Sequence, residues 1–174
     1  MNEITPIKAV FVGRMCPLHF GHERIIRKMF EFAGGKGNTL VFIGSVNEPL
    51  SSRTCFSYEE RRRFFNAVFS GVRVLGIPDF HNIPRWLAYL DDLIRIVGNA
   101  DPREVTYFGG CPEDVRFFKD DGRKIKIINR FDGTAFQISA TEVRAALAAG
   151  APLEKYLNPL IREDVQRTFS ERLE

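Results

Sequence analysis

The chain has 174 residues, of which 44% are hydrophobic and 27% charged, and its formal net charge is +3. This length and composition fit one globular domain with a real hydrophobic core and exclude a disordered chain. No apolar run is long enough to cross a bilayer, and so small a net charge does not indicate nucleic-acid binding. We expect a single domain over residues 1–174, in which 151–174 form a C-terminal helical segment, without a membrane or nucleic-acid partner.

The predicted elements alternate between strands and helices along the chain. Short β-prone runs predict five strands, over residues 7–12, 39–46, 72–77, 104–108 and 124–129. Helical spacing of apolar residues predicts helices over 21–33, 58–69, 84–98, 113–118, 139–149 and 160–173. Strict alternation of strand and helix indicates an α/β fold with a doubly wound, Rossmann-like parallel sheet of five strands, helices on both faces and a C-terminal helical extension.

Local signals fix several of the predicted helix ends. Gly34 and Gly35 should stop the first helix, and S-x-x-E patterns predict capping boxes that begin at Ser57 and Ser139. The fully charged stretch 59–63 is expected to be a solvated first turn. In the last helix, apolar residues four apart form a stripe that would cover either the core or a neighbouring subunit.

The ends and the cysteines bear on the cellular compartment. Residues 1–6 lack the basic and apolar regions of a signal peptide, which favours the cytoplasm. Cys16, Cys55 and Cys111 are an odd number without close spacing, so they fit neither a disulfide framework nor a structural zinc site. We predict free thiols.

The stretch GRMCPLHFGH, residues 13–22, joins the first predicted strand to the first predicted helix. A strand that ends in glycine before a helix start brings backbone N–H groups and a positive dipole end to one point, which favours anion binding. Ligands of doubly wound sheets bind at the carboxyl ends of the strands, where this loop lies. We interpret it as a phosphate-binding loop.

His19 and His22 lie three residues apart at this helix start, and three interpretations compete. They could bind a metal, although neither an acidic partner nor an H-E-x-x-H pattern lies nearby. They could be histidines without a special role, which the spacing alone favours over a metal site. They could donate to phosphate oxygens, an interpretation that gains from Arg14 and from the strand-to-helix context.

A second candidate motif is ISATEVR, residues 138–144. Ser139, Thr141 and Arg144 all lie at the first turn of a predicted helix. Taken alone, the motif describes a capped helix with an exposed arginine.

The two motifs together resemble the paired signature of the nucleotidylyltransferase superfamily, HxGH after the first strand and ISxTxxR after the fifth. The chain is most similar to archaeal-type nicotinamide mononucleotide (NMN) adenylyltransferases, whose motifs commonly read GRxQPxHxGH and SGTEIR or SATDIR. Further likenesses fall in the same order along residues 7–150: IGS at 43–45, Arg53, FS at 56–57, ER at 60–61, IPD at 77–79, Trp86, GCP at 110–112 and Arg116. The chain departs from the pattern at Cys16, Cys111 and Ala140, where the family usually has glutamine, asparagine and often glycine.

The resemblance implies a reaction and a set of roles. In this family the mononucleotide phosphate attacks the α-phosphorus of ATP in line, pyrophosphate leaves, and no enzyme nucleophile is used. It implies His19, His22, Arg14 and Arg144 as catalytic residues and, with them, Gly13, Gly110, Ser139 and Thr141 as ATP-binding residues. Mg²⁺ is expected to be carried by the ATP phosphates without dedicated protein ligands.

The second substrate implied by the resemblance is a pyridine mononucleotide. Arg53 matches an arginine that meets its phosphate, and Asp79 would bind the ribose or the amide, or else only cap the next helix. Trp86 would stack on the nicotinamide ring, or else pack in the core beside two leucines. We expect ATP and this mononucleotide as partners, and a homo-oligomer.

Several alternatives stay open. Another superfamily member, a phosphopantetheine adenylyltransferase or a cytidylyltransferase, is the nearest, and residues 130–133 (RFDG) loosely echo the late motif of the latter. A non-catalytic nucleotide-binding regulator and a metal-dependent hydrolase are the others. The intact His19, His22 and Arg144 argue against the regulator.

Overall fold

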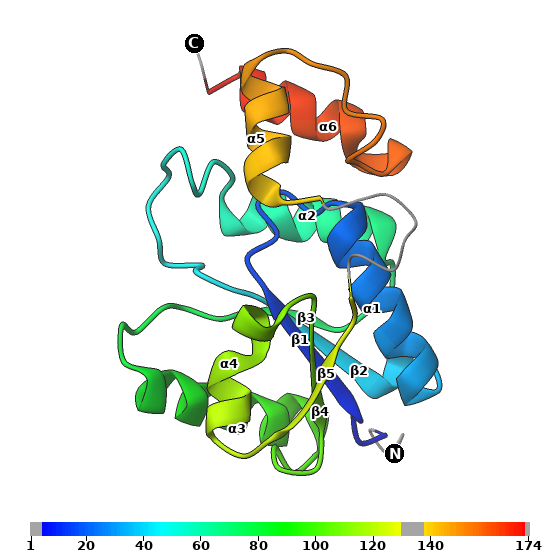
Figure 1. Ribbon diagram of the computed structural model, residues 1–174, viewed down its shortest axis with the longest axis vertical. Coiled ribbons are helices and arrows are strands. Elements are labelled where there is room, and N and C mark those ends of the chain that lie inside the picture. Colours follow the sequence, from blue (N-terminus) through cyan, green and yellow to red (C-terminus); the bar gives the residue numbers. More distant parts are fainter. Residues whose placement is uncertain (1–4, 130–137, 173–174) are drawn as a thin grey trace.

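The computed structural model describes residues 5–129 and 138–172, and it places five parallel strands in one sheet (Figure 1). The strand order is β3-β2-β1-β4-β5. The strands are β1 (Ala9–Gly13), β2 (Thr39–Ile43), β3 (Val74–Gly76), β4 (Thr106–Gly109) and β5 (Lys124–Ile127). The predicted Rossmann-like α/β fold is confirmed. Residues 130–133, the loose echo of a cytidylyltransferase motif, lie outside the described residues.

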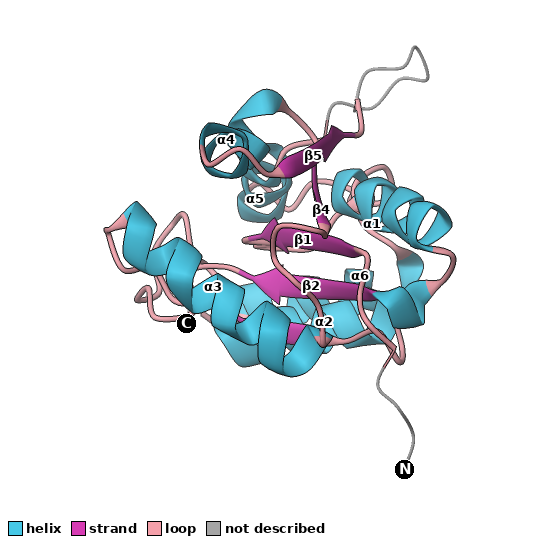
Figure 2. Cartoon of the chain, turned by 90° about the horizontal axis from the view of Figure 1, so that it is seen from below, coloured by secondary structure: helices cyan, strands magenta, loops and turns pink. Residues whose placement is uncertain are grey.

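Helices cover both faces of this sheet, as predicted (Figure 2). The helices are α1 (Phe20–Ala33), α2 (Tyr58–Val68), α3 (Ile83–Gly98), α4 (Pro112–Asp120), α5 (Ala140–Ala148) and α6 (Pro159–Ser170), with a short 3₁₀ turn η1 (Lys36–Asn38). Buried side chains of α1, α2, α5 and α6 form one apolar cluster, and those of α3 and α4 form the other. None of the helices in the described ranges is long and apolar enough to cross a membrane.

The local helix signals are confirmed. Gly34 ends α1 with a positive φ of 77°, a conformation that glycine adopts without strain. Ser57 and Ser139 both begin capping boxes: the hydroxyl of Ser57 accepts from the N–H of Glu60 at 3.2 Å, and that of Ser139 accepts from the N–H of Glu142 at 3.2 Å. In turn, the carboxylate of each glutamate accepts a hydrogen bond from the backbone N–H of its serine.

All five strands are shorter than their predicted β-prone runs, and in two of them the contacts that end or delay the strand are evident. The run 39–46 leaves the sheet after Ile43, because Ser45 has a positive φ of 55° and the side chain of Arg61 binds the carbonyl oxygens of Gly44 and Ser45. The run 72–77 contributes only Val74–Gly76, since the N–H of Val72 still bonds to Phe69 in the turn that follows α2.

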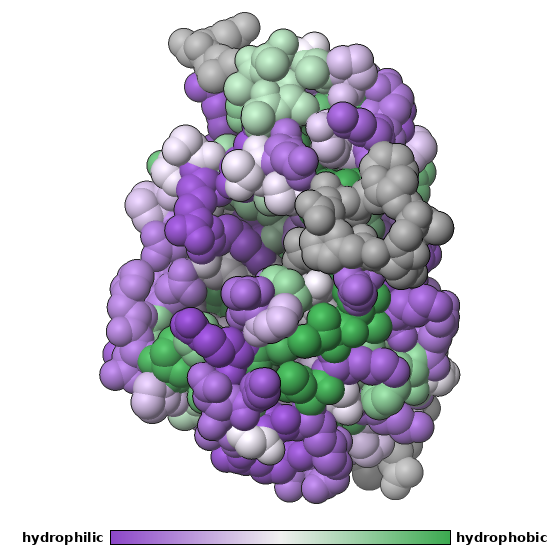
Figure 3. Space-filling view, viewed as in Figure 1, coloured by the Kyte–Doolittle hydropathy of each residue, from purple (hydrophilic) through white to green (hydrophobic). Residues whose placement is uncertain are grey.

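The order of the strands reverses beside β1. β1 pairs with β2 on one side and with β4 on the other. The connections toward the two sides therefore lie on opposite faces of the sheet, with α1 and α2 on one face and α3 and α4 on the other. Gly13 and Gly109 end these two neighbouring strands. A ligand of a doubly wound sheet is expected at this point. The space-filling view is hollowed near the middle, between α5 above and α4 below (Figure 3).

The C-terminal stripe covers the core of its own chain. Ile161 and Val165 of α6 are buried in the cluster that contains α1 and α2, and α6 lies beside α2 (Figure 1). Arg63 donates two hydrogen bonds to Asp164, at 2.8 and 3.0 Å, and fastens α6 to α2. The last residue of the predicted stripe, Leu173, lies outside the described residues.

Candidate active site

The first turn of α1 is capped by two histidines. Nδ1 of His19 accepts hydrogen bonds from the backbone N–H groups of Gly21 at 3.1 Å and His22 at 3.4 Å. In return, Nδ1 of His22 accepts from the N–H of His19 at 3.4 Å. This is a capping box built from imidazoles instead of the usual serine and glutamate. The sequence predicted the helix start but not this cap.

These bonds decide which ring nitrogens can act as donors. A nitrogen that accepts a hydrogen bond carries a lone pair, so a neutral imidazole bonded through Nδ1 has its proton on Nε2. The two rings are stacked, with centroids 3.7 Å apart and planes 25° apart. In a neutral pair both protons are thus on Nε2, and an imidazole N–H is a donor type suited to the oxygens of a polyphosphate.

Gly21 is required by the ring of His19. A Cβ at position 21 would lie 2.9 Å from Cε1 of His19 and 3.3 Å from the carbonyl oxygen of Ile138. Neither the capping ring nor the backbone ahead of α5 can give way freely. The glycine of HxGH thus lets α5 approach the head of α1.

Arg144 joins the two predicted motifs. Its Nη1 donates to the carbonyl oxygen of Cys16 at 3.0 Å and its Nη2 to Oγ1 of Thr141 at 3.2 Å. Two motifs that are 128 residues apart in the chain thereby meet at one place.

Arg14 brings a second guanidinium to the loop. Its Nε donates to Oγ of Ser45 at 3.4 Å. Burial lowers the pKa of Arg14, and the nearby charges of Arg53 and Arg144 act in the same direction. The carboxylate of Asp79 acts in the opposite direction. Because an arginine titrates far above neutral pH, the group stays cationic and can bind an anion.

One cavity of about 220 Å³ collects most of the predicted phosphate-binding residues. Its wall includes Gly13, Arg14, His19, His22, Ser139 and Arg144. Thr141 and Gly110 do not line this cavity but bond to residues that do: Thr141 accepts from Arg144, and the N–H of Gly110 donates to Asp114 at 2.8 Å. The structure thus assembles the two motifs around a space lined by cations and N–H donors.

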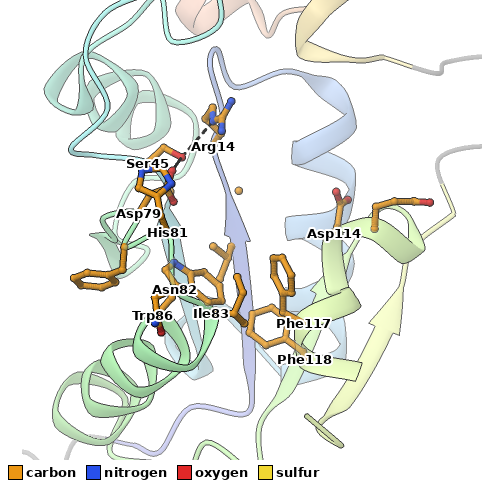
Figure 4. A pocket seen from close by; sticks show the side chains of 15 residues that line it. Arg14, Ser45, Asp79, His81, Asn82, Ile83, Trp86, Asp114, Phe117 and Phe118 are labelled. Atoms are coloured by element: carbon orange, nitrogen blue, oxygen red, sulfur yellow. Dashed lines mark hydrogen bonds between the residues drawn. The ribbon is translucent and has the colours of Figure 1, made fainter. Parts of the chain in front are cut away.

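A second cavity of about 400 Å³ adjoins the first and shares Gly13, Arg14 and Asp114 with it. Asp79 and Trp86 line it, together with apolar side chains of α3 and α4 (Figure 4). Two connected cavities, one cationic and one largely apolar, suit a reaction between two nucleotides.

Comparisons with known proteins identify similar sequences and folds. No family model matches the chain. A nicotinamide-nucleotide adenylyltransferase from Archaeoglobus fulgidus is 22% identical over 170 residues, which are 92% of this chain and 91% of that protein. One from Pyrococcus horikoshii is 27% identical over 154 residues, 85% of this chain and 76% of the relative. The chain is thus similar in sequence, at modest identity, to archaeal nicotinamide-nucleotide adenylyltransferases.

Several solved structures share the fold of this chain. A bifunctional NMN adenylyltransferase/ADP ribose pyrophosphatase from Francisella tularensis matches with a TM-score of 0.74 and 16% identity, over 95% of this chain and 52% of that one. The chain therefore spans about half the length of that bifunctional protein. A putative nicotinate-nucleotide adenylyltransferase from Vibrio parahaemolyticus matches with a TM-score of 0.58 and 17% identity, over 95% and 99% of the two chains.

Trp86 lies between the larger cavity and the apolar cluster of α3 and α4. It lines the larger cavity, and its ring also packs against Phe118 at 5.8 Å and Phe117 at 6.4 Å between centroids (Figure 4). It is only half-buried. An indole supported from behind by two phenyl rings is well placed to offer its exposed part to a flat ligand ring.

Arg53 is not on the wall of either cavity as far as the described residues show. Its side chain is exposed, yet its charge contributes to lowering the pKa of Arg14. The predicted mononucleotide-phosphate residue thus lies beside the site and not within it.

Arg61 corrects the expectation of a solvated stretch at 59–63. Its side chain is only 1% exposed, and its guanidinium donates to the carbonyl oxygens of Arg14 at 2.9 Å, Gly44 at 2.7 Å and Ser45 at 3.3 Å. It ties the loop after β1 to the loop after β2. Its position in the ER pair of the resemblance was the only sequence signal, because charge alone indicates solvent.

Two further residues were not among the predicted site residues. Ser45 donates to Oδ2 of Asp79 at 2.7 Å while it accepts from Arg14, so it links the two cavities. Asp114, in the first turn of α4, lines both. In residues 5–129 and 138–172, no three His, Cys, Asp or Glu side chains gather closely enough to hold a metal ion.

Proposed function

We propose that this chain catalyses transfer of the adenylyl group of ATP to NMN and releases NAD and pyrophosphate. The observation that carries the proposal is the stacked, backbone-capping pair His19 and His22 in one cavity with Arg14 and Arg144. The names of the archaeal relatives support the choice of reaction. An aromatic second cavity beside the phosphate site supports the choice of acceptor.

The phosphate cavity would act by position and charge. Nucleotidyl transfer gains mainly from alignment of the reacting groups and from donors aimed at the developing negative charge. We assign the Nε2–H groups of His19 and His22 to the ATP phosphates and the guanidinium groups of Arg14 and Arg144 to the triphosphate. Ser139, at the head of α5, adds its hydroxyl to the same wall. No protein nucleophile is needed, because the phosphate of the mononucleotide attacks directly.

The larger cavity would hold the mononucleotide. Arg14 lies where the cavities meet, so it can neutralise the attacking phosphate as well as the triphosphate. The cationic pyridine ring would lie against Trp86, since an indole face attracts a flat cation. Asp79, fixed by Ser45, would accept from the ribose hydroxyls or the amide. Arg53 would reach the mononucleotide phosphate from outside.

A divalent ion would enter this site bound to the phosphate oxygens. A solved bifunctional relative from Francisella tularensis is a complex with AMP and a manganese ion. In this chain, Asp114 lines both cavities, and its carboxylate would accept hydrogen bonds from the water shell of such an ion. Mg²⁺ keeps most of its waters and needs few protein ligands. When bound, it would neutralise the departing pyrophosphate.

The decisive test is product formation with purified protein, Mg²⁺ and ATP. With NMN as acceptor we expect NAD and pyrophosphate in equal amounts, and a His19→Ala, His22→Ala double variant should form neither. Parallel reactions with nicotinic acid mononucleotide, with phosphopantetheine and with CTP in place of ATP test the other superfamily reactions. If neither pyridine mononucleotide gives an adenylylated product, the proposed function is wrong.

A further inference from the structure

Two of the three thiols lie side by side, one in the phosphate loop and the other in the segment that leads into α2. Sγ of Cys16 and Sγ of Cys55 are 4.0 Å apart, although the residues are 39 positions apart in the chain. Both are buried, with 1% and 8% exposure. Cys16 belongs to the loop after β1, and Cys55 to the segment that leads into α2. The third thiol, Cys111, is at the head of α4 and takes no part in this pair.

The surroundings make one of the two sulfurs a nucleophile. The hydrogen bond from Cys55, aided by the backbone of Phe56 and the charge of Arg61, lowers the pKa of Cys16 to about 6 against the opposing effect of burial. The same shared proton raises the pKa of Cys55. These effects favour the thiolate at Cys16 and the thiol at Cys55, the arrangement of a reactive cysteine and its resolving partner.

The buried Cys16 lies beside a cavity from which a small oxidant would approach it. Cys16 lines the cavity of about 220 Å³ that also holds His19, His22 and Arg144. A peroxide molecule is smaller than the triphosphate for which we propose that space. Occupancy of the cavity by ATP should accordingly protect the sulfur.

We propose that Cys16 and Cys55 form a reversible disulfide under a hydroperoxide oxidant and that this bond switches off nucleotide binding at the phosphate loop. The effect on turnover rests on the proposed function, whereas bond formation does not.

The chemistry is balanced with hydrogen peroxide as the oxidant. The Cys16 thiolate attacks one peroxide oxygen, the O–O bond breaks, and a sulfenic acid forms as hydroxide leaves and takes up a proton to become water. The sulfur of Cys55 then attacks the sulfenic sulfur, the S–O bond breaks, and a second water leaves with the thiol proton. Two thiols are oxidised to one disulfide, and one peroxide is reduced to two waters.

Bond formation would move the loop that binds phosphate. The thiols are now in non-bonded contact and must approach further to join. The carbonyl oxygen of Cys16 accepts from Arg144, and His19, which caps α1, follows three residues later. A shift of Cys16 would therefore displace the guanidinium of Arg144 and the ring of His19. Misplacement of reacting groups by about 1 Å can cost roughly 100-fold in rate. We expect a loss of that order in the oxidised protein.

The experiment compares reduced and peroxide-treated full-length protein. After alkylation of remaining thiols in denaturant, peptide mapping should show a Cys16–Cys55 disulfide and a free, alkylated Cys111. Turnover and ATP affinity, the latter by calorimetric titration, should both fall and return with dithiothreitol. ATP present during peroxide treatment should slow bond formation.

Matched variants isolate the pair. Cys55→Ser should abolish the reversible loss of turnover and ATP affinity, and Cys111→Ser should retain it. For each variant, the turnover and ATP affinity of the oxidised protein are divided by those of the reduced protein. Failure to form the disulfide in folded protein overturns the switch, as does a disulfide that leaves ATP affinity unchanged. If the reduced protein binds ATP but does not adenylylate NMN, the proposed acceptor fails while the loss of ATP affinity on oxidation still supports the switch.

Discussion

Each of the two histidines serves the backbone with one ring nitrogen and the proposed substrate with the other. Nδ1 of each ring accepts from the first turn of α1, and this bond sets both the tautomer and the direction of the ring. A lysine could supply charge here but could not cap the helix. Histidine suits these positions because one ring nitrogen can cap the helix while the other donates to the proposed substrate.

We predict that His22→Ala lowers turnover by roughly 100-fold, the usual cost of losing one transition-state donor. The matched control is His22→Asn, whose side-chain oxygen can still accept from the N–H of His19 but lacks an Nε2 donor. Both variants should lose turnover, whereas only His22→Ala should lose the cap and melt earlier. Turnover near the wild-type value in His22→Ala would contradict the assigned role.

Trp86 is predicted to act on the mononucleotide more than on ATP. Because its ring lines the larger cavity and not the smaller one, Trp86→Ala should raise the KM for NMN several-fold more than the KM for ATP. Trp86→Phe keeps an aromatic face and should fall between. Equal changes in both KM values, with a matching loss of thermal stability, would assign Trp86 to packing against Phe117 and Phe118 alone.

Arg61 is predicted to be a positioning residue. Its removal leaves the carbonyl oxygens of Arg14 and Gly44 without their buried donor, at about 1–3 kcal/mol for each unsatisfied group. Arg61→Met should thus lower the free energy of unfolding by about 3 kcal/mol in urea titration. Exposed Arg62→Met, the neighbour on the same helix, is the control and should change it little. A stable Arg61→Met variant would show that the two loops hold their positions without it.

Helices α1, α2 and α5 were predictable because their signals are local. The cap residue and its glutamate lie three positions apart, and a glycine that stops a helix lies next to it. The end of β2 was not predictable in this way. It depends on Arg61, which reaches Gly44 from α2 and has no signature near residue 44. The contact between Cys16 and Cys55 is likewise a product of the fold and not of spacing.

The capping boxes of α2 and α5 form a natural pair for experiment, because they have the same chemistry in different surroundings. Ser57→Ala and Ser139→Ala should each lower stability by about 1 kcal/mol, as loss of an N-cap does. Only Ser139 lines the phosphate cavity, so only Ser139→Ala should also weaken ATP binding. Calorimetric titration of ATP with both variants checks this, and an equal loss of affinity in the two would place Ser139 outside the ATP site.

Ion pairs join segments that are far apart in the sequence. Arg63 of α2 holds Asp164 of α6, and Arg123, which precedes β5, holds Asp91 of α3 at 3.0 Å. The fold class followed from the alternation of elements, and the place of the site followed from the two motifs. These tertiary pairs did not, since a charge in a sequence does not say which distant partner it will meet.

Acid should loosen the attachment of α6. The hydrogen bonds from Arg63 hold the pKa of Asp164 below its usual value, with further help from the charge of Arg63 and from Arg167. The folded pKa lies below the unfolded value of about 3.9, so the stabilising effect is complete above that pH and is lost as the pH falls through the folded pKa. Urea titrations should therefore show this contribution unchanged from pH 7 to 5 and shrinking below pH 4.

Asp164→Asn separates this pair from the general effect of acid. The variant should be less stable than the wild type at pH 7, and the difference between the two should narrow below pH 4, because the wild-type carboxylate is protonated there as well. Asp92→Asn is the control, since Asp92 makes an exposed ion pair with Arg95 within α3 and joins no separate segments. A difference between Asp164→Asn and the wild type that stays constant down to pH 2 would show that the charge of Asp164 does not hold α6 in place.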